Sequence, residues 1–410
     1  MDPPTLAAVK ILDLQPLTVR HATVVNSLGV GRDATLEALR AGRSGLRPCT
    51  FETVDLDTFV GEVPGVDDAE IPERLANFDC RNNRLAHMAL LSDGFTAAVE
   101  CAVQKYGAHR IGLFLGTSTS GILSSEQAYR QRDPQTGALP ASYDFAATHS
   151  TSSLADFVGR YLGLEGPAFV VSSACSTTAK VFGNAARMIQ AGVCDAAVVG
   201  GADSLCLTTL YGFHSLELVS KRPCAPFDID RDGVSLGEAA GFALLERAGP
   251  DDRRDDIRLL GVGESNDAYH MSTPHPEGLG ARLAMEGALR AAGLRANDIG
   301  YVNLHGTATP YGDASEDRAI TELFGADTPC SSTKGYTGHT LGAAGIVEAV
   351  ISILSLQSGF MPGSAQTRTL DPALRSRYLL ENESGAMDRV MTNSFGFGGT
   401  NCSLIFGWAA

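Results

Sequence analysis

Apolar and polar stretches alternate along the chain in a pattern that predicts a layered α/β protein. Two apolar runs in the first half, Arg110–Gly116 and Ala168–Ser172, end in small residues, as buried strands of an α/β sheet do. The second run leads into the short turn Ser173–Thr178 and an alanine-rich amphipathic segment that reaches Gln190 and is closed by Gly192. This order predicts a strand, a tight turn and a helix with a C-terminal glycine.

Similar elements recur along the rest of the chain. A further strand is expected at Asp195–Gly201, and the polar run Gly249–Asp256 marks the clearest boundary. Beyond it we expect strand Ile257–Val262, helix Gly280–Ala292, strand Gly300–Leu304, helix Ala314–Phe324, and strands Arg389–Thr392 and Cys402–Phe406. The pattern therefore predicts two α/β halves, residues 1–249 and 250–410, joined by a charged linker.

Composition narrows the class of protein. A chain of 410 residues with 44% hydrophobic content can bury a large core. Its formal net charge of −15 disfavours nucleic acid and anionic membranes as partners, since both would be repelled. The start, Met1–Gln15, lacks a basic region and a long apolar region, and no run approaches the ~18 uninterrupted apolar residues of a membrane helix. We expect a soluble, cytoplasmic protein.

The nine cysteines contain no Cys-x-x-Cys pair, which argues against a zinc knuckle or a redox pair and suggests free thiols in a reducing compartment. Cys175 stands out among them because it lies between a predicted strand and the first turn of a helix. Backbone N–H groups and the helix dipole favour a thiolate there, and its small neighbours would let a thioester approach. A cysteine that merely packs is the alternative.

Two of the nine histidines share a distinctive setting. His305 and His339 each lie in a Gly/Thr-rich turn between a strand and a helix, and such turns gather at the carboxyl ends of parallel strands, where α/β sheets place their sites. A structural role for each histidine remains the alternative. One cysteine and two histidines could also bind a metal, but their spacings match no usual ligand pattern, so we expect no metal site.

The motifs around these three residues resemble those of a known family. Cys175 in Ser-Ser-Ala-Cys-Ser-Thr, His305 in His-Gly-Thr-Ala-Thr-Pro and His339 in Thr-Gly-His-Thr-Leu-Gly-Ala-Ala-Gly are similar to the Cys-His-His triad of the elongating β-ketoacyl-acyl-carrier-protein synthases. Further matches follow in the family's order: Pro226–Gly233, Gly237–Glu238, Asp267–His270, Gly312–Asp313 and Asn393–Asn401. The resemblance implies a thiolase-like fold, with two duplicated halves in alternating helix and sheet layers, usually as a dimer.

Neighbouring classes of the superfamily fit less well. Initiating synthases use Cys-His-Asn, biosynthetic thiolases carry a C-terminal Cys-x-Gly motif that we do not find, and chain-length factors lack the nucleophile. The chain also departs from the elongating synthases, because Leu17–Gly29 loses their Thr-Gly turn and Ala239 stands where glycine is common. These departures resemble the synthases of aryl-polyene and pigment clusters.

The resemblance implies a role for each matching residue. The Cys175 thiolate would attack an acyl thioester, with the backbone N–H groups of Cys175 and Phe397 as the oxyanion hole. Malonyl carrier protein would then lose CO2, and neutral His305 and His339 would donate hydrogen bonds to the enolate. The Phe397 ring, between glycines, would gate the acyl pocket, whereas Phe395 suits a fixed place in the core.

Supporting and docking residues follow from the same resemblance. Lys334 and Glu348 are expected to hold the surroundings and protonation state of the second histidine, with a structural ion pair as the alternative. Thr307 and Thr309 would bond the pantetheine amides, or bond only within their turn. Four arginines are docking candidates for an acidic carrier protein: Arg81 and Arg84, and more weakly Arg130 and Arg132, each with a solvated surface role as the alternative.

The implied enzyme is an acyltransferase that uses no cofactor beyond the carrier protein's phosphopantetheine. Its expected partners are acyl carrier protein and a second subunit, in a homodimer or in a heterodimer with a chain-length-factor-like chain. Two other functions remain possible from the sequence. One is a non-elongating partner subunit, against which the intact triad argues, and the other is an acyl-thioester hydrolase, in which two enolate-stabilising histidines would be superfluous.

Overall fold

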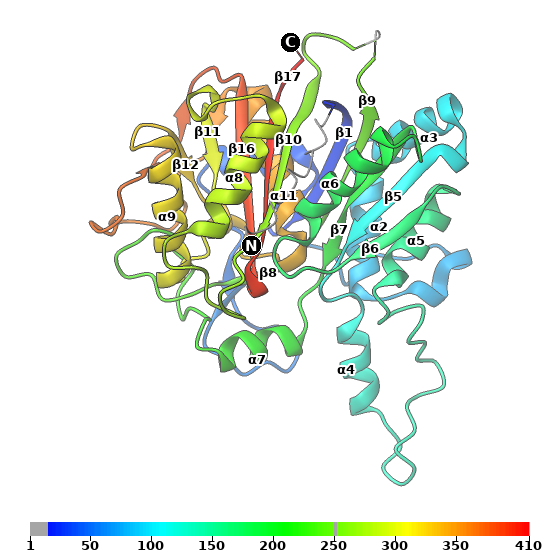
Figure 1. Ribbon diagram of the computed structural model, residues 1–410. Helices are drawn as coiled ribbons and strands as arrows, with labels where there is room; N and C mark the ends of the chain where they lie inside the picture. Colours follow the sequence, from blue (N-terminus) through cyan, green and yellow to red (C-terminus); the bar gives the residue numbers. More distant parts are fainter. Residues whose placement is uncertain (1–14, 250–251, 410) are drawn as a thin grey trace, which may run out of the picture.

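The computed structural model describes residues 15–249 and 252–409, and one large sheet runs through both halves of this part (Figure 1). Its strands lie side by side in the order β14 (Arg377–Tyr378), β12 (Pro329–Ser331), β11 (Tyr301–Asn303), β16 (Arg389–Gly396), β17 (Thr400–Trp408), β10 (Ile257–Asn266), β1 (Leu17–Asn26), β9 (Ala239–Arg247), β7 (Ala196–Asp203), β5 (Ile111–Gly116) and β6 (Ala168–Val171), with β2 (Gly29–Val30) paired to β1.

The strand directions reveal an internal duplication. In the first half, β6, β5 and β7 are parallel, and β9 and β1 continue the sheet antiparallel. In the second half, β12, β11 and β16 are parallel, and β17 and β10 continue antiparallel. The two units meet where the start of β1 pairs with β10 through Leu17 and Thr18. Each half thus contains the same unit of three parallel and two antiparallel strands, and the short strand β14 adds a further parallel strand at the edge of the second half.

Helices form layers around and between these two units. Helices α6 (Thr177–Gln190) and α11 (Ala344–Ser358) pack against each other and against strands of both halves. Helices α2 (Arg81–Leu91), α3 (Phe95–Tyr106) and α5 (Ser152–Leu162) cover the first half, and α8 (Leu279–Ala292) and α9 (Pro310–Phe324) cover the second. This alternation of helix and sheet layers is the thiolase-like arrangement expected from the sequence.

Shorter elements complete the described chain. The helices are α1 (Arg32–Arg40), α4 (Ile122–Arg130), α7 (Leu207–Ser215) and α10 (Lys334–Thr337). The single-turn and 3-10 segments are η1 (Glu73–Phe78), η2 (Ala108–Arg110), η3 (Ala296–Asp298), η4 (Leu341–Ala343) and η5 (Phe397–Gly399). Two small sheets contain β3 (Arg47–Pro48), β4 (Phe59–Gly61) and β8 (Leu236–Gly237), and β13 (Phe360–Met361) and β15 (Glu383–Ser384). Helix α4 and the loop after it project from the body (Figure 1).

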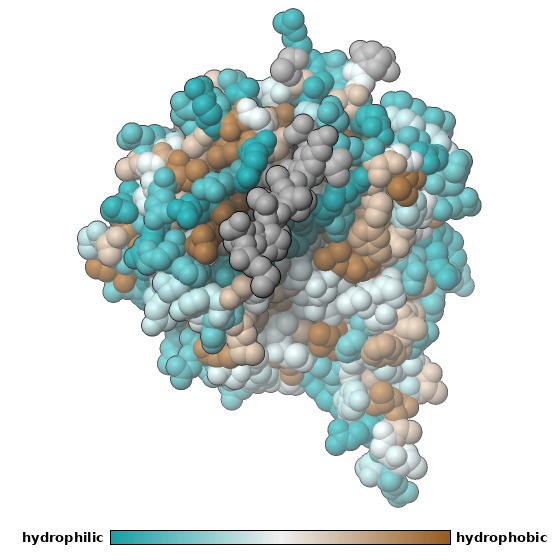
Figure 2. All heavy atoms as spheres, viewed as in Figure 1, coloured by the Kyte–Doolittle hydropathy of each residue, from teal (hydrophilic) through white to brown (hydrophobic). Residues whose placement is uncertain are grey.

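The elements expected from the sequence are present, with ends shifted by a few residues. The predicted helix up to Gln190 is α6, and the predicted strand Ile257–Val262 is the first part of β10, which continues to Asn266. The division of the chain at residue 249 stays a prediction, and residues 250–251 of the charged linker lie outside the described residues. The face in Figure 2 is mostly hydrophilic, as the net charge of −15 suggests.

One described stretch, Leu341–Ser358, is long and apolar enough to cross a membrane by length and composition alone. It contains α11, and 89% of it is buried inside the protein. The buried core helix of a folded protein passes the same test. The apolar character of this stretch is therefore explained by the packing of α11 against strands of both halves of the sheet.

Candidate active site

A strained turn presents Cys175 between β6 and α6. Ala174, the residue before it, has a φ of 51°, in the left-handed region that non-glycine residues rarely adopt. The turn is closed by Thr177, whose hydroxyl accepts from the Ser173 N–H at 2.8 Å and donates to the Ala174 carbonyl at 2.6 Å. Thr177, the first residue of α6, therefore fixes the turn that carries Cys175, the predicted nucleophile.

Burial dominates the chemistry of the Cys175 sulfur. The residue is only 5% exposed, and loss of water raises the pKa of its thiol to about 11. The Lys334 charge and the Phe397 backbone N–H oppose this rise. Burial thus opposes the thiolate that the helix dipole is expected to favour. The sequence shows that a helix follows Cys175 but does not show how completely the surrounding layers exclude water.

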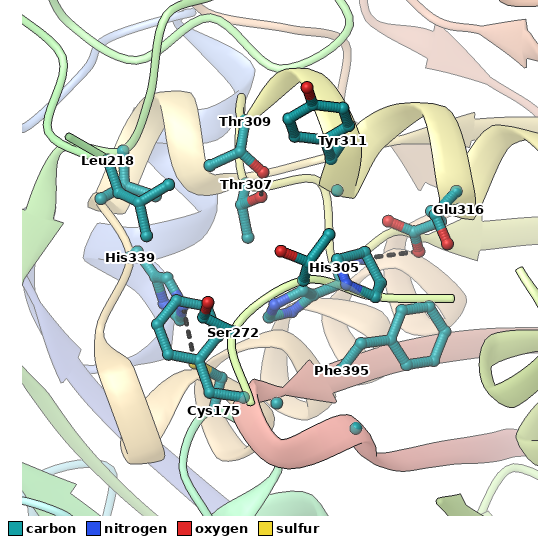
Figure 3. A pocket seen from close by; sticks show the side chains of 18 of the residues that line it. Cys175, Leu218, Ser272, His305, Thr307, Thr309, Tyr311, Glu316, His339 and Phe395 are labelled. Carbon is teal, nitrogen blue, oxygen red and sulfur yellow. Dashed lines mark hydrogen bonds between the residues drawn. The ribbon is translucent and has the colours of Figure 1, made fainter. Parts of the chain in front are cut away.

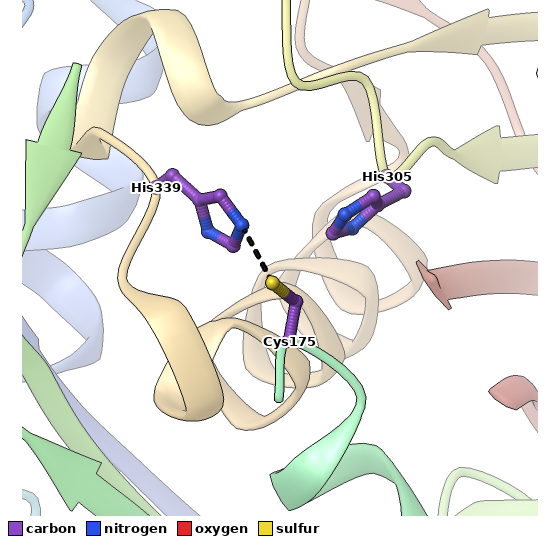
Figure 4. Close-up of side chains that lie close together, drawn as sticks. All are labelled: Cys175, His305 and His339. Atoms are coloured by element: carbon purple, nitrogen blue, oxygen red, sulfur yellow. Dashed lines mark hydrogen bonds between the residues drawn. The ribbon is translucent and has the colours of Figure 1, made fainter. Parts of the chain in front are cut away.

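His339 contacts the sulfur directly (Figure 4). Its Nε2 lies 3.1 Å from Cys175 Sγ, while its Nδ1 accepts a hydrogen bond from the Leu341 N–H at 3.2 Å. Because Nδ1 is an acceptor, the ring proton lies on Nε2, which faces the sulfur. Burial, and then the Lys334 charge, hold the pKa of His339 well below its usual value. His339 is thus a neutral hydrogen-bond donor directed at the reacting atom.

His305 has the same form for a different reason. The Lys334 ammonium lies 3.3 Å from its Nδ1, so this nitrogen also acts as an acceptor and leaves the proton on Nε2. Burial, the Lys334 charge and His339 hold the pKa of His305 well below its usual value. The two imidazole rings are perpendicular, with centroids 5.4 Å apart. One ligand atom each from Cys175, His305 and His339 lies within 4.8 Å of the others.

Lys334 and Glu348 form the buried pair that the sequence suggested, but their contacts differ from the prediction. Lys334 Nζ donates to Glu348 Oε1 and to the backbone carbonyl of His305, the first histidine of the triad. No direct bond to His339 is recorded among the described residues, and Lys334 acts on that histidine through charge alone. Burial raises the pKa of Glu348 to about 7, against the opposing effect of Lys334. The pair thus contacts the first histidine, and the expected effect on the protonation state of the second is exerted by the Lys334 charge and stays a prediction.

Glu316 supports the His305 turn and was missed in the sequence. Its carboxylate accepts from the backbone N–H groups of His305, at 2.9 Å, and Gly306, at 2.8 Å, and from the Asn393 amide at 3.2 Å. Burial raises its pKa. Its position in the first turns of α9, just after the Gly/Thr-rich turn, is the signal that could have identified it, because acidic residues there can accept from a preceding loop.

A cavity of about 440 Å³ opens in front of the triad (Figure 3). Thr307 and Thr309 lie next to each other on its wall, with hydroxyl oxygens 2.8 Å apart, and His339 and then Cys175 lie below them in the view. A bound amide could exchange for the bond between the two hydroxyls. The predicted pair of threonines is therefore in the same cavity as the triad.

The two phenylalanines of the glycine-rich turn both line the cavity but have different neighbours. Phe397 lines the cavity, and its backbone N–H donates to the Cys175 sulfur. The glycines that follow it, Gly398 and Gly399, have φ values of 77° and 72°. The Phe395 ring lies 5.9 Å from that of His305 and packs against the buried cluster around β11 and α9. The gating role of Phe397 and the fixed place of Phe395 stay predictions.

Arg81 lies inside the protein and does not present a docking charge. Its side chain is 8% exposed and makes two hydrogen bonds of 2.7 Å to Glu238, which is fully buried, and a further one to Asp67 at 2.5 Å. The docking role predicted for Arg81 is therefore wrong, because carboxylates already occupy its guanidinium. Arg84 is partly exposed and is paired with Asp79 at 2.6 Å.

This pairing predicts a stability effect. Arg81→Ala leaves the Glu238 carboxylate buried without its partner, and we expect it to lower the free energy of unfolding by about 3–5 kcal/mol. Arg84→Ala is the matched control on the same helix, and its exposed pair should contribute at most about 1 kcal/mol. Urea denaturation of both variants measures the difference. Equal losses in the free energy of unfolding would show that the buried Arg81–Glu238 pair contributes no more to stability than the exposed Arg84–Asp79 pair.

The weaker docking candidates lie on the projecting segment. Arg130 is exposed and paired with Glu52 at 3.2 Å, and Arg132 is exposed and donates to the Tyr129 carbonyl. They and Arg84 remain candidates for contact with a carrier protein.

Two family models match the chain. The model for the β-ketoacyl synthase N-terminal domain matches residues 22–250, and the model for the C-terminal domain matches residues 257–368. The chain belongs to the β-ketoacyl synthase family. Its relatives include the 3-oxoacyl-[acyl-carrier-protein] synthase 2 of Vibrio cholerae, which is 35% identical over 93% of this chain and 96% of its own length. The mitochondrial synthase of Arabidopsis thaliana is 42% identical over 60% of this chain and 57% of its own length.

Solved structures agree with this assignment. A ketosynthase from Xenorhabdus doucetiae, solved in complex with its chain length factor, is 39% identical with a TM-score of 0.86, covering 97% of this chain and 99% of its own. A β-ketoacyl synthase from Burkholderia phymatum is 29% identical with a TM-score of 0.85, covering 97% of this chain and all of its own. The thiolase-like fold and the resemblance are confirmed. This synthase is an acyltransferase of the elongating kind.

Proposed function

We propose that Cys175, His305 and His339 carry out a decarboxylative condensation between a Cys-bound acyl chain and malonyl carrier protein. The observation that carries the proposal is the arrangement of one buried thiol and two neutral histidines, with ligand atoms within 4.8 Å, at one side of a cavity walled by two threonines. The carrier's pantetheine enters along Thr307 and Thr309, whose hydroxyls bond its amides. No cofactor is needed beyond that arm.

Acylation uses the sulfur and two backbone donors. Cys175 gives up its proton and attacks the acyl thioester, and the carrier's thiol leaves with a proton. The backbone N–H groups of Cys175 and Phe397 stabilise the charge on the carbonyl oxygen. The His339 Nε2–H hydrogen bond, 3.1 Å long, favours the thiolate during the attack, which offsets part of the burial that raises the pKa of Cys175.

Condensation uses the two histidines. Malonyl carrier protein loses CO2, and the electron pair of the broken C–C bond forms an enolate. His305 and His339 hold the enolate oxygen through their Nε2–H groups, which their neighbours Lys334 and Leu341 leave protonated. The enolate carbon attacks the acyl-Cys175 carbonyl, and the thiolate leaves and regains a proton. The product is a β-ketoacyl thioester, two carbons longer, on the carrier protein.

The partners follow from the relatives. We propose that acyl carrier protein delivers both substrates and that the chain works in a dimer, either with itself or with a chain length factor. The second form is favoured by the 39% identity to the Xenorhabdus ketosynthase, which was solved with such a subunit. We further propose a cytoplasmic location and a role in fatty acid, polyene or polyketide elongation.

Intact-mass analysis after incubation with a panel of acyl carrier proteins tests this proposal. We expect one acyl group per chain, lost in Cys175→Ala and kept in Cys101→Ala, which removes the exposed cysteine. Addition of malonyl carrier protein should then release a β-ketoacyl thioester. Release of free acid would mean a hydrolase, and absence of acylation would point to a non-elongating partner subunit.

A further inference from the structure

Helix α7 (Leu207–Ser215) lies at the surface and contributes one ring to the wall of the active-site cavity. Leu210 is the one residue of the helix that is fully buried, and it packs in a cluster with Leu123 and Leu341. Phe213 lines the cavity together with Leu216 and Leu218 from the segment that follows. A surface helix thus reaches the cavity through Phe213, which no step of the condensation uses.

Phe213 stacks on Phe397. The two ring centroids are 5.6 Å apart and the ring planes differ by 22°, a stacked aromatic contact. Phe397 is held on both sides in this arrangement, because its backbone N–H donates to the Cys175 sulfur while its ring lies against Phe213. Movement of the Phe397 ring out of its present position in the cavity wall must therefore break this stack.

The two rings differ in how firmly they are held. The start of α7 is fixed by Glu126 on α4 (Ile122–Arg130), whose carboxylate accepts from the backbone N–H groups of Leu207 at 3.0 Å and Thr208 at 2.7 Å. The middle of α7 is fixed by Tyr211, whose hydroxyl accepts from the Asp55 N–H at 3.0 Å. Phe397, in contrast, is followed by Gly398, around which no atom would contact an added Cβ. The helix that carries Phe213 is thus anchored at two points, whereas Phe397 lies in a turn that has open space at Gly398.

We infer that Phe213 is a positioning residue that holds the Phe397 ring closed over Cys175 and so sets how readily an acyl chain enters. This inference rests on the acylation of Cys175 in the proposed function and on the gating role that the family resemblance implies for Phe397, and it adds the surface against which the gate closes. Loss of the Phe213 ring should favour the open position, and entry to Cys175 should become faster and less selective for chain length.

Iodoacetamide labelling of Cys175, followed by peptide mass mapping, tests the inference without any carrier protein. Phe213→Leu keeps an apolar side chain but removes the stack, and it should raise the labelling rate of Cys175 about 2- to 10-fold, the range expected for one aromatic pair. His214→Ala is the matched control, since His214 is exposed on the same helix, and it should label at the wild-type rate. An unchanged rate in Phe213→Leu would overturn the inference.

A double-mutant cycle with Phe397→Leu asks whether the two rings act as a pair. If they do, Phe213→Leu, Phe397→Leu and the double variant should label Cys175 at similar rates, whereas additive increases would overturn the inference. Glu126→Ala keeps both rings but releases the start of α7, and it should also raise the labelling rate of Cys175. A labelling rate at or below that of the wild type would contradict the inference. Thermal unfolding confirms that each variant is folded.

Acylation by carrier proteins of different chain length then separates this inference from the proposed function. Wild-type protein that never acylates would refute the proposed function, whatever the labelling shows. Wild-type protein that acylates, with a Phe213→Leu variant of unchanged labelling and unchanged chain-length preference, would refute only the role of Phe213. A broadened preference in Phe213→Leu is the expected result.

Discussion

Replacing Cys175 by Gln should abolish acyl transfer while leaving decarboxylation of malonyl carrier protein intact or faster. The amide of Gln can imitate the acylated cysteine, so the site should behave as if it had already completed the first half of the reaction. Decarboxylation depends on the two histidines. Burial and the Lys334 charge keep both rings neutral, and the contacts of Lys334 and Leu341 with the Nδ1 atoms leave the ring proton on Nε2. Release of CO2 from labelled malonyl carrier protein measures this step, and protein-bound label from acyl carrier protein measures acylation.

His305→Ala and His339→Ala should both lose decarboxylation, the step that Cys175→Gln keeps. Each removes one donor to the enolate, and we expect decarboxylation to fall about 10²-fold or more, as for the loss of one oxyanion-hole donor. His339→Ala should also slow acylation, because its Nε2–H bond of 3.1 Å to the sulfur is lost. Normal decarboxylation in His339→Ala would show that this histidine does not hold the enolate.

Lys334→Met should weaken both the fold and the condensation. Removing the ammonium leaves Glu348 buried without its partner, at an expected cost of about 3–5 kcal/mol in the free energy of unfolding. Burial already holds the pKa of Glu348 above its unfolded value, so the folded state takes up a proton that the unfolded state lacks. Stability should therefore fall further as the pH rises through 7, and urea denaturation at several pH values measures this dependence.

The same variant should change the pH dependence of decarboxylation. The Lys334 charge lowers the pKa of both His305 and His339, so its removal allows both values to rise towards their usual range. Because the histidines must be neutral, activity should be lost at a higher pH on the acid side than in the wild type. Glu348→Gln, which keeps the ammonium, is the matched control and should not shift the profile upwards. If the acid side of the pH profile for decarboxylation is unchanged in Lys334→Met, Lys334 does not set the protonation state of the histidines and has a structural role alone.

The sequence was a good guide to those features that depend on neighbours along the chain. Apolar runs located β5 and β7, which are buried along their whole length, and also β6, which lies at the edge of the sheet and is only partly buried. The helix after Cys175 ends at the predicted Gln190. The resemblance to the synthase motifs also predicted that the three triad residues lie together, as they do in the structure. Strand β9 was not predicted, although it is buried along most of its length.

Features that depend on contacts between distant residues could not be predicted. Arg81 appeared as a surface charge because nothing near it in sequence indicates that Glu238 lies beside it. Lys334 likewise contacts His305 and not His339, although His339 is nearer to it in the sequence. This contact arises because α10, which begins at Lys334, lies beside the end of β11 in the fold. The full burial of the Cys175 sulfur depends on the packing of entire layers, which no local pattern describes.

The position of β1 also bears on how the chain folds during synthesis. It is the first described strand to leave the ribosome, yet its main partner is β9, where Leu17 lies opposite Arg247, and its start pairs with β10 at Leu259. Both edges of an apolar strand must therefore wait while most of the first half is translated. Unpaired strand edges invite association with other chains, and pairings this distant in sequence form slowly. Expression of this synthase should accordingly benefit from chaperones that bind nascent chains and shield β1 until β9 and β10 have been translated.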